Sequence, residues 1–182
     1  MQIRELSRQE SEEFLKPVRL GRLACARNGQ PYVTPGFFAL QDNSLYSFSS
    51  VGKKITWMRQ NPLVCVEFDE VVAPQNWTTV IVQGKYEEFP NTPEFVNMRQ
   101  RAHELLQARP VWWEPAYVKT IQRGDTRSLE PLYFRILIES LSGHRGVSDA
   151  ARRSETGWAE KILSASKTLF AQPTGLHRRT SN

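Results

Sequence analysis

Alternating apolar and polar positions fill much of the first fifty residues and predict three consecutive β-strands. Two strand-like runs, 20–27 and 30–40, flank Asn28-Gly29. This dipeptide is the one that best supplies the positive φ angles of a tight hairpin turn. A second turn at 41–43 leads into an alternating run over 44–49. These segments predict an antiparallel meander of three strands.

Three more strands are expected further along the chain. A short, apolar, β-branched run covers 63–68, and a longer alternating run covers 77–89, with a loop expected at 71–76 between them. The run 131–139 is apolar enough to lie at the centre of a sheet. Six strands with few helices predict a mainly β fold, a β-barrel with flanking helices.

Helix signals occur at three places. Ser7 and Glu10 have the spacing of a capping box, which predicts a helix that ends at Pro17 and precedes the first strand. A second helix is expected over 53–60, before Asn61-Pro62. Thr92 and the proline after it predict a third, reaching about residue 108. The aromatic stretch 111–115 that follows predicts an ordered loop packed on an apolar surface.

Length and charge divide the chain into a domain and a tail. The 182 residues, 40% of them hydrophobic, suffice for one folded domain, which we place at 1–146, with a basic tail at 147–182 that is disordered or accessory. Of the 24 basic and 19 acidic residues, six basic and two acidic lie after residue 150, so the first 150 residues carry only 18 and 17. The tail could contact RNA or anionic lipid, or simply be solvated.

Several functional classes are disfavoured because the sequence lacks the features that they require. No apolar run reaches the roughly 20 residues of a membrane span, and no apolar signal core begins the chain, so we expect a cytoplasmic protein. Cys25 and Cys65 are interpreted as buried thiols, and the three histidines are scattered, so we expect no disulfide and no metal site. The usual nucleotide-binding and hydrolase motifs are missing.

One segment does suggest a ligand. Residues 47–54, Ser-Phe-Ser-Ser-Val-Gly-Lys-Lys, run from a strand end through hydroxyls and glycine into a helix start. Free backbone N–H groups, the positive end of the helix dipole and two lysines together favour a bound phosphate. The alternative is that Ser50 caps a surface helix and that Lys53 and Lys54 are merely solvated.

The order of four segments resembles a known family. They are GRLACARNGQPYVTPGFFAL, LYSFSSVGKKITWMRQNPLVCVEFDEV, NWTTVIVQGKYEEF and FRILIESLSGHRG. Together they resemble the pyridoxamine 5′-phosphate oxidase-like superfamily of FMN-binding split barrels, and most closely its nitroimidazole-resistance-like branch, over residues 15–146. The resemblance implies a homodimer of six-stranded split barrels with one FMN in each of two clefts between the subunits.

The resemblance also implies roles for individual residues. In this family a strand matching 32–36 lies along the isoalloxazine ring, the turn and helix start matching 49–54 hold the phosphate, and the partner subunit closes the cleft. The implied cofactor-binding residues are Tyr32, Val33, Thr34, Pro35, Ser49, Ser50, Lys53, Lys54, Trp77 and Thr79. Lys54 matches the phosphate lysine, and Lys53 stands where the vitamin oxidases often have arginine. Tyr32 could instead be a core aromatic, and Trp112 and Trp113 could seal the dimer interface.

The implied activity is an oxidoreductase that passes electrons from NAD(P)H through FMN to a small oxidised acceptor. The sequence identifies neither the substrate nor any catalytic residue. Gly143-His144-Arg145 stands where the vitamin oxidases have an Arg-x-His arrangement, which weakens the case for pyridoxamine phosphate as substrate. Alternatives are a non-enzymatic flavin carrier or sensor and a haem-binding split barrel. A nucleic-acid-binding barrel is disfavoured by the near-neutral charge of the first 150 residues.

Overall fold

The computed structural model describes residues 1–17, 19–107, 120–122, 125–127 and 131–147. Its strands are β1 (Gln2–Leu6), β2 (Arg19–Arg27), β3 (Gln30–Gln41), β4 (Ser44–Ser49), β5 (Leu63–Ala73), β6 (Asn76–Phe89), β7 (Thr120–Gln122), β8 (Asp125–Arg127) and β9 (Leu132–Val147). Its helices are α1 (Arg8–Leu15), α2 (Lys53–Gln60), the 3₁₀ turn η1 (Pro93–Phe95) and α3 (Val96–Gln107). Trp112, Trp113 and the predicted tail from 148 onward lie outside the described residues.

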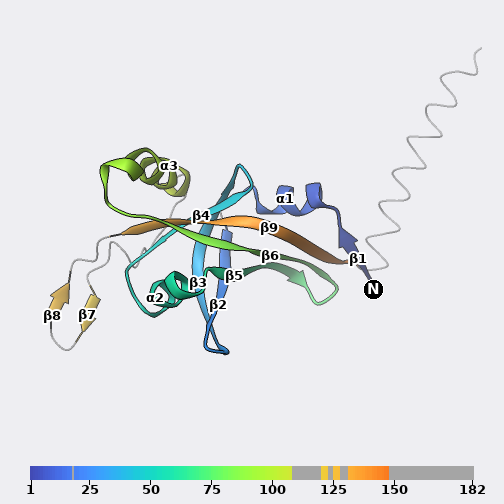
Figure 1. The fold of residues 1–182 in the computed structure, drawn as a ribbon. Coiled ribbons are helices and arrows are strands. Elements are labelled where there is room, and N and C mark those ends of the chain that lie inside the picture. The colour runs from blue at the N-terminus through green and yellow to red at the C-terminus, as the bar shows by residue number, and fades with distance from the viewer. Residues whose placement is uncertain (18, 108–119, 123–124, 128–130, 148–182) are drawn as a thin grey trace, which may run out of the picture.

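Six strands close into a barrel, which confirms the predicted mainly β fold. The seven-stranded antiparallel sheet has the order β1-β9-β4-β3-β2-β5-β6, and β6 also pairs with β9. That extra pairing closes the ring from β9 through β4, β3, β2, β5 and β6, while β1 lies outside it (Figure 1). The short β7–β8 hairpin forms a separate sheet and was not predicted.

The long strand β9 holds the barrel together. One edge pairs with β6 from Tyr133 to Gly146, and the other edge pairs first with β4 and then with β1. A bulge on β9 at Glu139, opposite Gln83 and Gly84 of β6, adjusts this seam. A Cβ added at Gly84 would lie 2.1 Å from the carbonyl oxygen of Leu137, so only glycine allows the two strands to approach so closely.

Both predicted hairpin turns are present. Asn28 and Gly29 have φ angles of 51° and 78°, and Asp42 and Asn43 have φ angles of 47° and 56°. Two consecutive positive φ angles define the tight turns whose twist matches that of the flanking strands. The meander of β2, β3 and β4 therefore forms as the sequence indicates.

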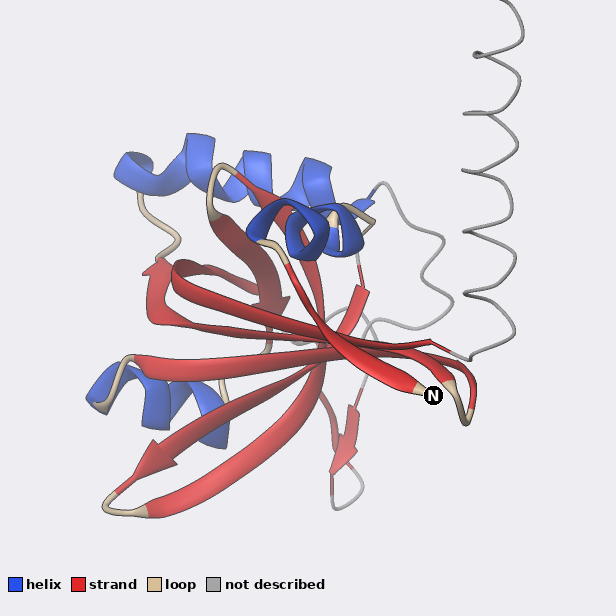
Figure 2. Ribbon diagram, turned by 90° about the vertical axis from the view of Figure 1, so that its right-hand side faces the viewer, coloured by secondary structure: helices blue, strands red, loops and turns tan. Residues whose placement is uncertain are grey.

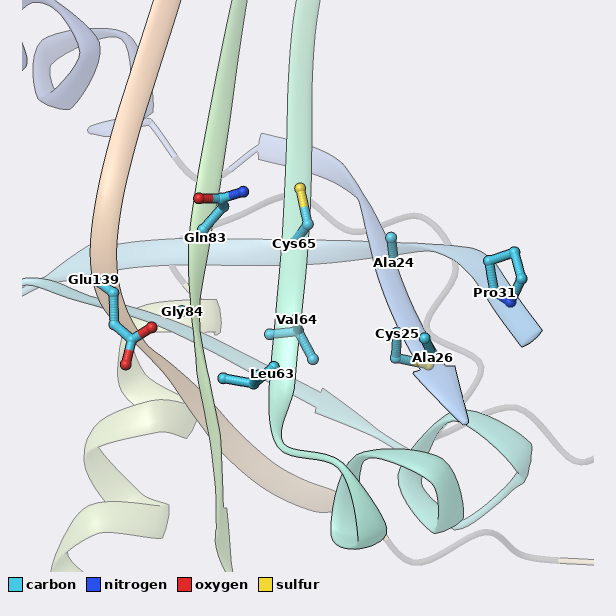
Figure 3. Close-up of a pocket in the computed structure, with 10 residues that line it drawn as sticks. All are labelled: Ala24, Cys25, Ala26, Pro31, Leu63, Val64, Cys65, Gln83, Gly84 and Glu139. Carbon is cyan, nitrogen blue, oxygen red and sulfur yellow. The ribbon is translucent and has the colours of Figure 1, made fainter. Parts of the chain in front are cut away.

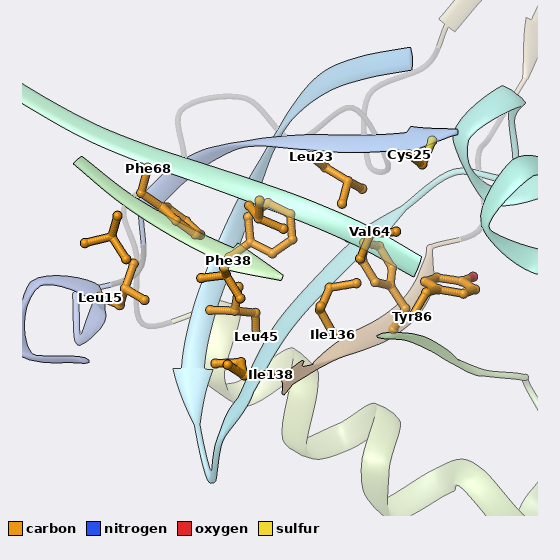
Figure 4. Packing of buried hydrophobic residues seen from close by; sticks show 14 of the residues in the cluster. Leu15, Leu23, Cys25, Phe38, Leu45, Val64, Phe68, Tyr86, Ile136 and Ile138 are labelled. Atoms are coloured by element: carbon orange, nitrogen blue, oxygen red, sulfur yellow. The ribbon is translucent and has the colours of Figure 1, made fainter. Parts of the chain in front are cut away.

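The core fills the barrel (Figure 4) and continues beneath two of the helices that Figure 2 shows against the sheet. Inside the ring, Phe38, Phe68 and Phe134 meet edge to face. The helix α2 buries Ile55 and Met58 against this cluster. On the outside, α3 covers β4 and β9 through a second cluster that includes Ala102 and Leu106. The helix α3 does not cover the outer surface of β2 and β5.

Three sequence expectations were wrong, one on the order of elements and two on their length, since β9 runs to Val147 where the strand was expected to end at residue 139. The strand β1 precedes α1, although the helix was expected first. Its first four side chains are exposed and show no apolar alternation, and it is held by backbone pairing with β9 and by Leu6, which is buried in the core. The loop expected at 71–76 is shorter, because β5 continues to Ala73. The alternative in which Ser50 caps α2 is not met, since Gly52 occupies the N-cap position and makes no side-chain cap bond.

The capping box at Ser7 is formed as predicted. The Ser7 hydroxyl accepts from the Glu10 N–H at 3.2 Å, and the Glu10 carboxylate accepts from the Ser7 N–H at 2.9 Å. Hydrogen bonds from Arg4 and Ser7 lower the pKa of Glu10 to about 2. We expect Ser7→Ala to lower the free energy of unfolding by about 1 kcal/mol. Urea unfolding followed by tryptophan fluorescence would measure this, and an unchanged midpoint would contradict it.

Candidate functional site

Much of strand β3 has an edge that no other described strand covers. Residues 30–38 pair with β2 along one edge, whereas pairing with β4 is confined to residues 39–41. The Phe37 carbonyl accepts from the Ser47 hydroxyl at 2.7 Å, so Phe37 directs its backbone groups away from β2. In an antiparallel strand this direction alternates, so Val33 and Pro35 direct theirs to the same edge. This open edge can hydrogen-bond a planar ligand.

Two prolines simplify the hydrogen-bonding pattern of that edge. Pro31 and Pro35 occupy the positions that point away from β2, where the lack of an N–H costs no pairing. Within this described stretch, Val33 therefore supplies the only backbone donor between them, while the carbonyl groups remain available as acceptors. Along the edge, the Pro31 carbonyl is followed by the Val33 N–H and then by the carbonyls of Val33 and Pro35. This order of acceptor, donor and acceptors matches a ring system that carries both donor and acceptor atoms.

The helix α2 begins beside this strand and carries both predicted lysines. Its N-cap, Gly52, provides no side-chain acceptor for the first N–H groups of the helix. The Lys53 ammonium lies 4.5 Å from the ring centroid of Tyr32 and 4.6 Å from that of Trp57. These two rings meet edge to face at 5.7 Å. These contacts place the Lys53 ammonium between the Tyr32 ring of β3 and the Trp57 ring of α2, so the structure brings Tyr32 and Lys53 together.

The second lysine has a different environment. Lys54 is half-buried, and burial lowers the pKa of its ammonium group. Both Lys53 and Lys54 act electrostatically on the Cys25 thiol, whose pKa is raised by burial, so both ammonium groups lie near β2. No carboxylate in the described part of the chain contributes to the pKa of Lys54. A half-buried cation without a counter-ion favours binding of an anion.

The two serines of the turn differ in availability. Ser49 is buried, and its hydroxyl donates to the Ser50 carbonyl at 2.9 Å. Ser50 is only partly buried and lies closer to the helix start. Ser50 and the N–H groups that follow Gly52 are therefore better placed than Ser49 to donate to an anion at the start of α2.

Trp77 and Thr79 lie far from the lysines within one chain. On β6, Thr79 pairs with Asp69 of β5. Tyr32, which contacts Lys53, is paired across the sheet with Cys25 on β2, then Val64 on β5, and finally Gly84 on β6. Five residues along a strand separate Thr79 from Gly84, or about 17 Å. A single chain therefore does not bring Trp77 and Thr79 to the lysine end of the barrel.

Three residues that the sequence did not suggest anchor α2 to the barrel. Arg59 donates to both carboxylate oxygens of Glu88 at 2.8 and 2.7 Å, and the Tyr86 hydroxyl donates to Glu88 at 2.8 Å. Arg59 lowers the pKa of Glu88, while burial raises the pKa of Tyr86. Because Arg59 and Glu88 are 29 positions apart, only the tertiary structure reveals this contact.

The outer surface of the barrel carries a shallow groove of about 420 Å³ (Figure 3). It is lined by Ala24, Cys25, Ala26, Pro31, Leu63, Val64, Cys65, Gln83, Gly84 and Glu139. We call the outward-pointing side chains of Ala24, Ala26, Leu63 and Cys65 the β2–β5 face. Cys25 is buried as predicted, whereas Cys65, which was also expected to be buried, is only partly buried. Val33, next to Ala24 across the strands, extends this face to the open edge of β3.

Comparison with known proteins identifies the family. A family profile described as pyridoxamine 5′-phosphate oxidase matches residues 7–145. The chain belongs to this family. The match covers five strands of the closed ring in full and β9 as far as Arg145, and it includes the open edge of β3 and the start of α2. The predicted resemblance to the FMN-binding split-barrel superfamily is thereby confirmed.

Individual relatives of the family agree with this assignment. An uncharacterized protein of Rhizobium meliloti is 36% identical over 143 residues, which are 79% of this chain and 95% of that protein. The crystal structure of an FAD-binding protein from Mesorhizobium loti is 40% identical, with a TM-score of 0.66, and covers 81% of this chain and 99% of that one. A protein from Bacteroides thetaiotaomicron that is described as a 5-nitroimidazole antibiotic resistance protein is 17% identical, with a TM-score of 0.56 over 80% and 89% of the two chains, and shares the fold.

The residues at α2 fit the phosphate of a flavin nucleotide, the cofactor type of the family. Lys54 offers an ammonium with no described counter-ion, and the start of α2 offers N–H groups without side-chain acceptors.

The described residues contain no group of three or more histidine, cysteine or acidic side chains that could hold a metal ion. None of the described helices is both long and apolar enough to cross a bilayer.

Proposed function

We propose that this chain binds FMN, with the phosphate at the start of α2 and the ring along the open edge of β3. The observation that carries the proposal is the half-buried Lys54 ammonium, which has no described carboxylate partner and lies beside the helix N-terminus. Lys54 and the first N–H groups of α2 would hold the phosphate, and Ser49, Ser50 and Lys53 would assist.

The open edge of β3 supports the position of the ring. The pyrimidine side of an isoalloxazine alternates acceptor and donor atoms, and Val33 N–H with its flanking carbonyl groups forms a complementary row. Tyr32 and Thr34 pair with β2 and so hold this part of β3 in place, and Pro35 contributes no N–H donor to the open edge. FAD contains the same riboflavin 5′-phosphate unit, and the Mesorhizobium loti relative is described as FAD-binding, so FAD is the second candidate.

We further propose an oxidoreductase that works in the cytoplasm. A bound flavin supplies hydride and electron transfer, so it could pass electrons from NAD(P)H to a small oxidised acceptor. The protein residues then bind and orient: Lys54 fixes the phosphate end, and the β3 edge fixes the ring end. No residue of this chain is assigned a proton-transfer role.

The proposed unit is a homodimer. Trp77 and Thr79 lie too far along β6 to reach the lysine end of their own barrel, so they would contribute to the cleft of a second copy. The apolar β2–β5 face, open in the single chain, is the surface that the second copy would cover.

Purified protein mixed with FMN is expected to show flavin absorption bands after gel filtration and to quench flavin fluorescence. Riboflavin, which lacks the phosphate, should bind at least tenfold more weakly, because it cannot reach Lys54. Equal binding of FMN and riboflavin would contradict the proposed phosphate site. Oxidation of NADH or NADPH with quinone, nitroaromatic or free-flavin acceptors would distinguish an enzyme from a flavin carrier.

A further inference from the structure

The last turn of α2 is tied to strand β6 by the ion pair between Arg59 and Glu88. Arg59 donates from Nε and from Nη2 to the two carboxylate oxygens of Glu88, and such a two-point contact fixes direction as well as distance. The Glu88 carboxylate also accepts from the Tyr86 hydroxyl. The Tyr86 ring is buried in the core, with its centroid 5.3 Å from that of Phe134. The β6 end of the ion pair is therefore held rigidly.

Arg59 and Lys54 lie on opposite flanks of the buried side of α2. Successive residues of an α-helix are rotated by about 100°, which places Arg59 about 140° around the helix axis from Lys54. Ile55 and Met58, both fully buried, occupy the sector between them. Lys54 faces β2, where it acts on a buried thiol, whereas Arg59 faces β6. A contact that holds one flank of the helix thus also sets the direction of the other.

The start of α2 has no polar anchor of its own. Among the described residues, 52–54 make no side-chain hydrogen bond or ion pair to a barrel strand, and the N-cap Gly52 has no side chain that could make one. At the other end of the helix, the Asn61 amide donates to the Ala26 carbonyl of β2 at 3.0 Å, and Arg59 bonds to β6. Polar contacts at the end of α2 therefore hold the helix whose start carries the lysines.

A rotation of α2 about its own axis would move the Lys54 ammonium out of its half-buried position. The buried Ile55 and Met58 oppose such a rotation only weakly, because apolar contacts are non-directional. The fork of the Arg59 guanidinium opposes it strongly, since a rotated helix would break one or both hydrogen bonds to Glu88.

We propose that Arg59 and Glu88 are positioning residues for the flavin phosphate: their ion pair fixes the rotation of α2 that directs Lys54 and the first N–H groups to it. The inference rests on the proposed binding of FMN at the start of α2. It gives the ion pair an effect on the affinity for FMN, although neither residue touches the ligand.

Titration of FMN and of riboflavin into the full-length Glu88→Gln protein, followed by flavin fluorescence, tests the inference. Glutamine keeps the shape of the side chain but loses its charge and one acceptor. The variant is expected to bind FMN about fivefold more weakly than the wild type, and riboflavin with unchanged affinity, because riboflavin has no phosphate to be misplaced. Glu87→Gln is the matched control: it removes the ion pair with Arg135 from the neighbouring position of β6, and it should bind FMN as the wild type does.

Variants of Arg59 test whether the two residues act through each other. Arg59→Met should weaken FMN binding as much as Glu88→Gln, and the double variant should bind no more weakly than either single variant. Arg59→Lys keeps the charge without the two-point geometry, so it should restore only part of the affinity.

Three outcomes would overturn the inference. The first is wild-type affinity for FMN in Glu88→Gln. The second is an equal loss of FMN and riboflavin binding in that variant, which would indicate a general effect on the fold. The third is a double variant whose loss is the sum of the single losses, which would show that the residues act separately. Failure of the wild type to bind FMN would instead reject the proposed function itself, and this inference with it.

Discussion

Replacing Lys54 with alanine is expected to weaken FMN binding tenfold to a hundredfold while leaving the barrel folded. A charge-assisted hydrogen bond contributes about 1.5–3 kcal/mol, and Lys54 is the half-buried cation at the start of α2. Its ammonium group makes no described ion pair whose loss would destabilise the fold. Fluorescence titration with FMN measures the affinity, and circular dichroism checks the fold.

Two lysine variants provide controls for that experiment. Lys53→Ala is expected to weaken FMN binding less than Lys54→Ala, because the Lys53 ammonium is partly engaged with the rings of Tyr32 and Trp57. Lys85→Ala, which removes an exposed lysine paired with Glu139, should leave the affinity unchanged. Wild-type affinity in both the Lys53 and Lys54 variants would mean that the phosphate binds elsewhere.

The same lysine predicts how FMN affinity depends on pH. Burial lowers the pKa of Lys54 in the free protein, and a bound phosphate dianion would raise it again. Above the free-state pKa, FMN must bind together with a proton, so affinity should fall as the pH rises through that value. Lys54→Arg should remove this decline, since a guanidinium stays charged. A pH-independent affinity of the wild type between neutral and strongly alkaline solution would contradict this role.

Local sequence signals predicted the elements whose geometry they control directly. Asn28-Gly29 imposes positive φ angles whatever surrounds it, and Ser7 with Glu10 forms its cap within four residues. The strand β1 carries no such signal, because four of its five side chains are exposed and its partner, residues 143–147 of β9, is far away in the sequence. The extension of β5 to Ala73 likewise depends on its partner β6 rather than on apolar alternation.

The candidate site was predictable only in part, for a related reason. Spacing alone placed Lys53 and Lys54 at a helix start, but it could not show that one lies between two rings while the other is half-buried. The two hydrogen bonds from Arg59 to Glu88 join segments 29 positions apart. Such contacts follow from the closure of the barrel, which no local pattern encodes.

Introducing an arginine at Cys65 is expected to convert the proposed homodimer to a monomer and to reduce FMN binding strongly. An antiparallel sheet that faces water usually presents polar side chains, yet the β2–β5 face presents Ala24, Ala26, Leu63 and Cys65, and Leu63 remains 55% exposed. A charge at the centre of this face would have to be desolvated in a dimer, at a cost of several kcal/mol. In the single chain the same arginine could reach water, so the barrel should fold.

Light scattering combined with FMN titration separates the possible outcomes for this face. Wild-type protein should have twice the mass of the chain, and Cys65→Arg should have the mass of one chain and at least tenfold weaker FMN binding, because Trp77 and Thr79 of a second copy would be lost from each cleft. Met98→Arg introduces the same charge at an exposed residue of α3, 42% exposed and outside the face, and should remain dimeric with wild-type affinity. A Cys65→Arg protein that stays dimeric would show that the copies meet elsewhere, and a monomer that binds FMN with wild-type affinity would show that one chain completes the site.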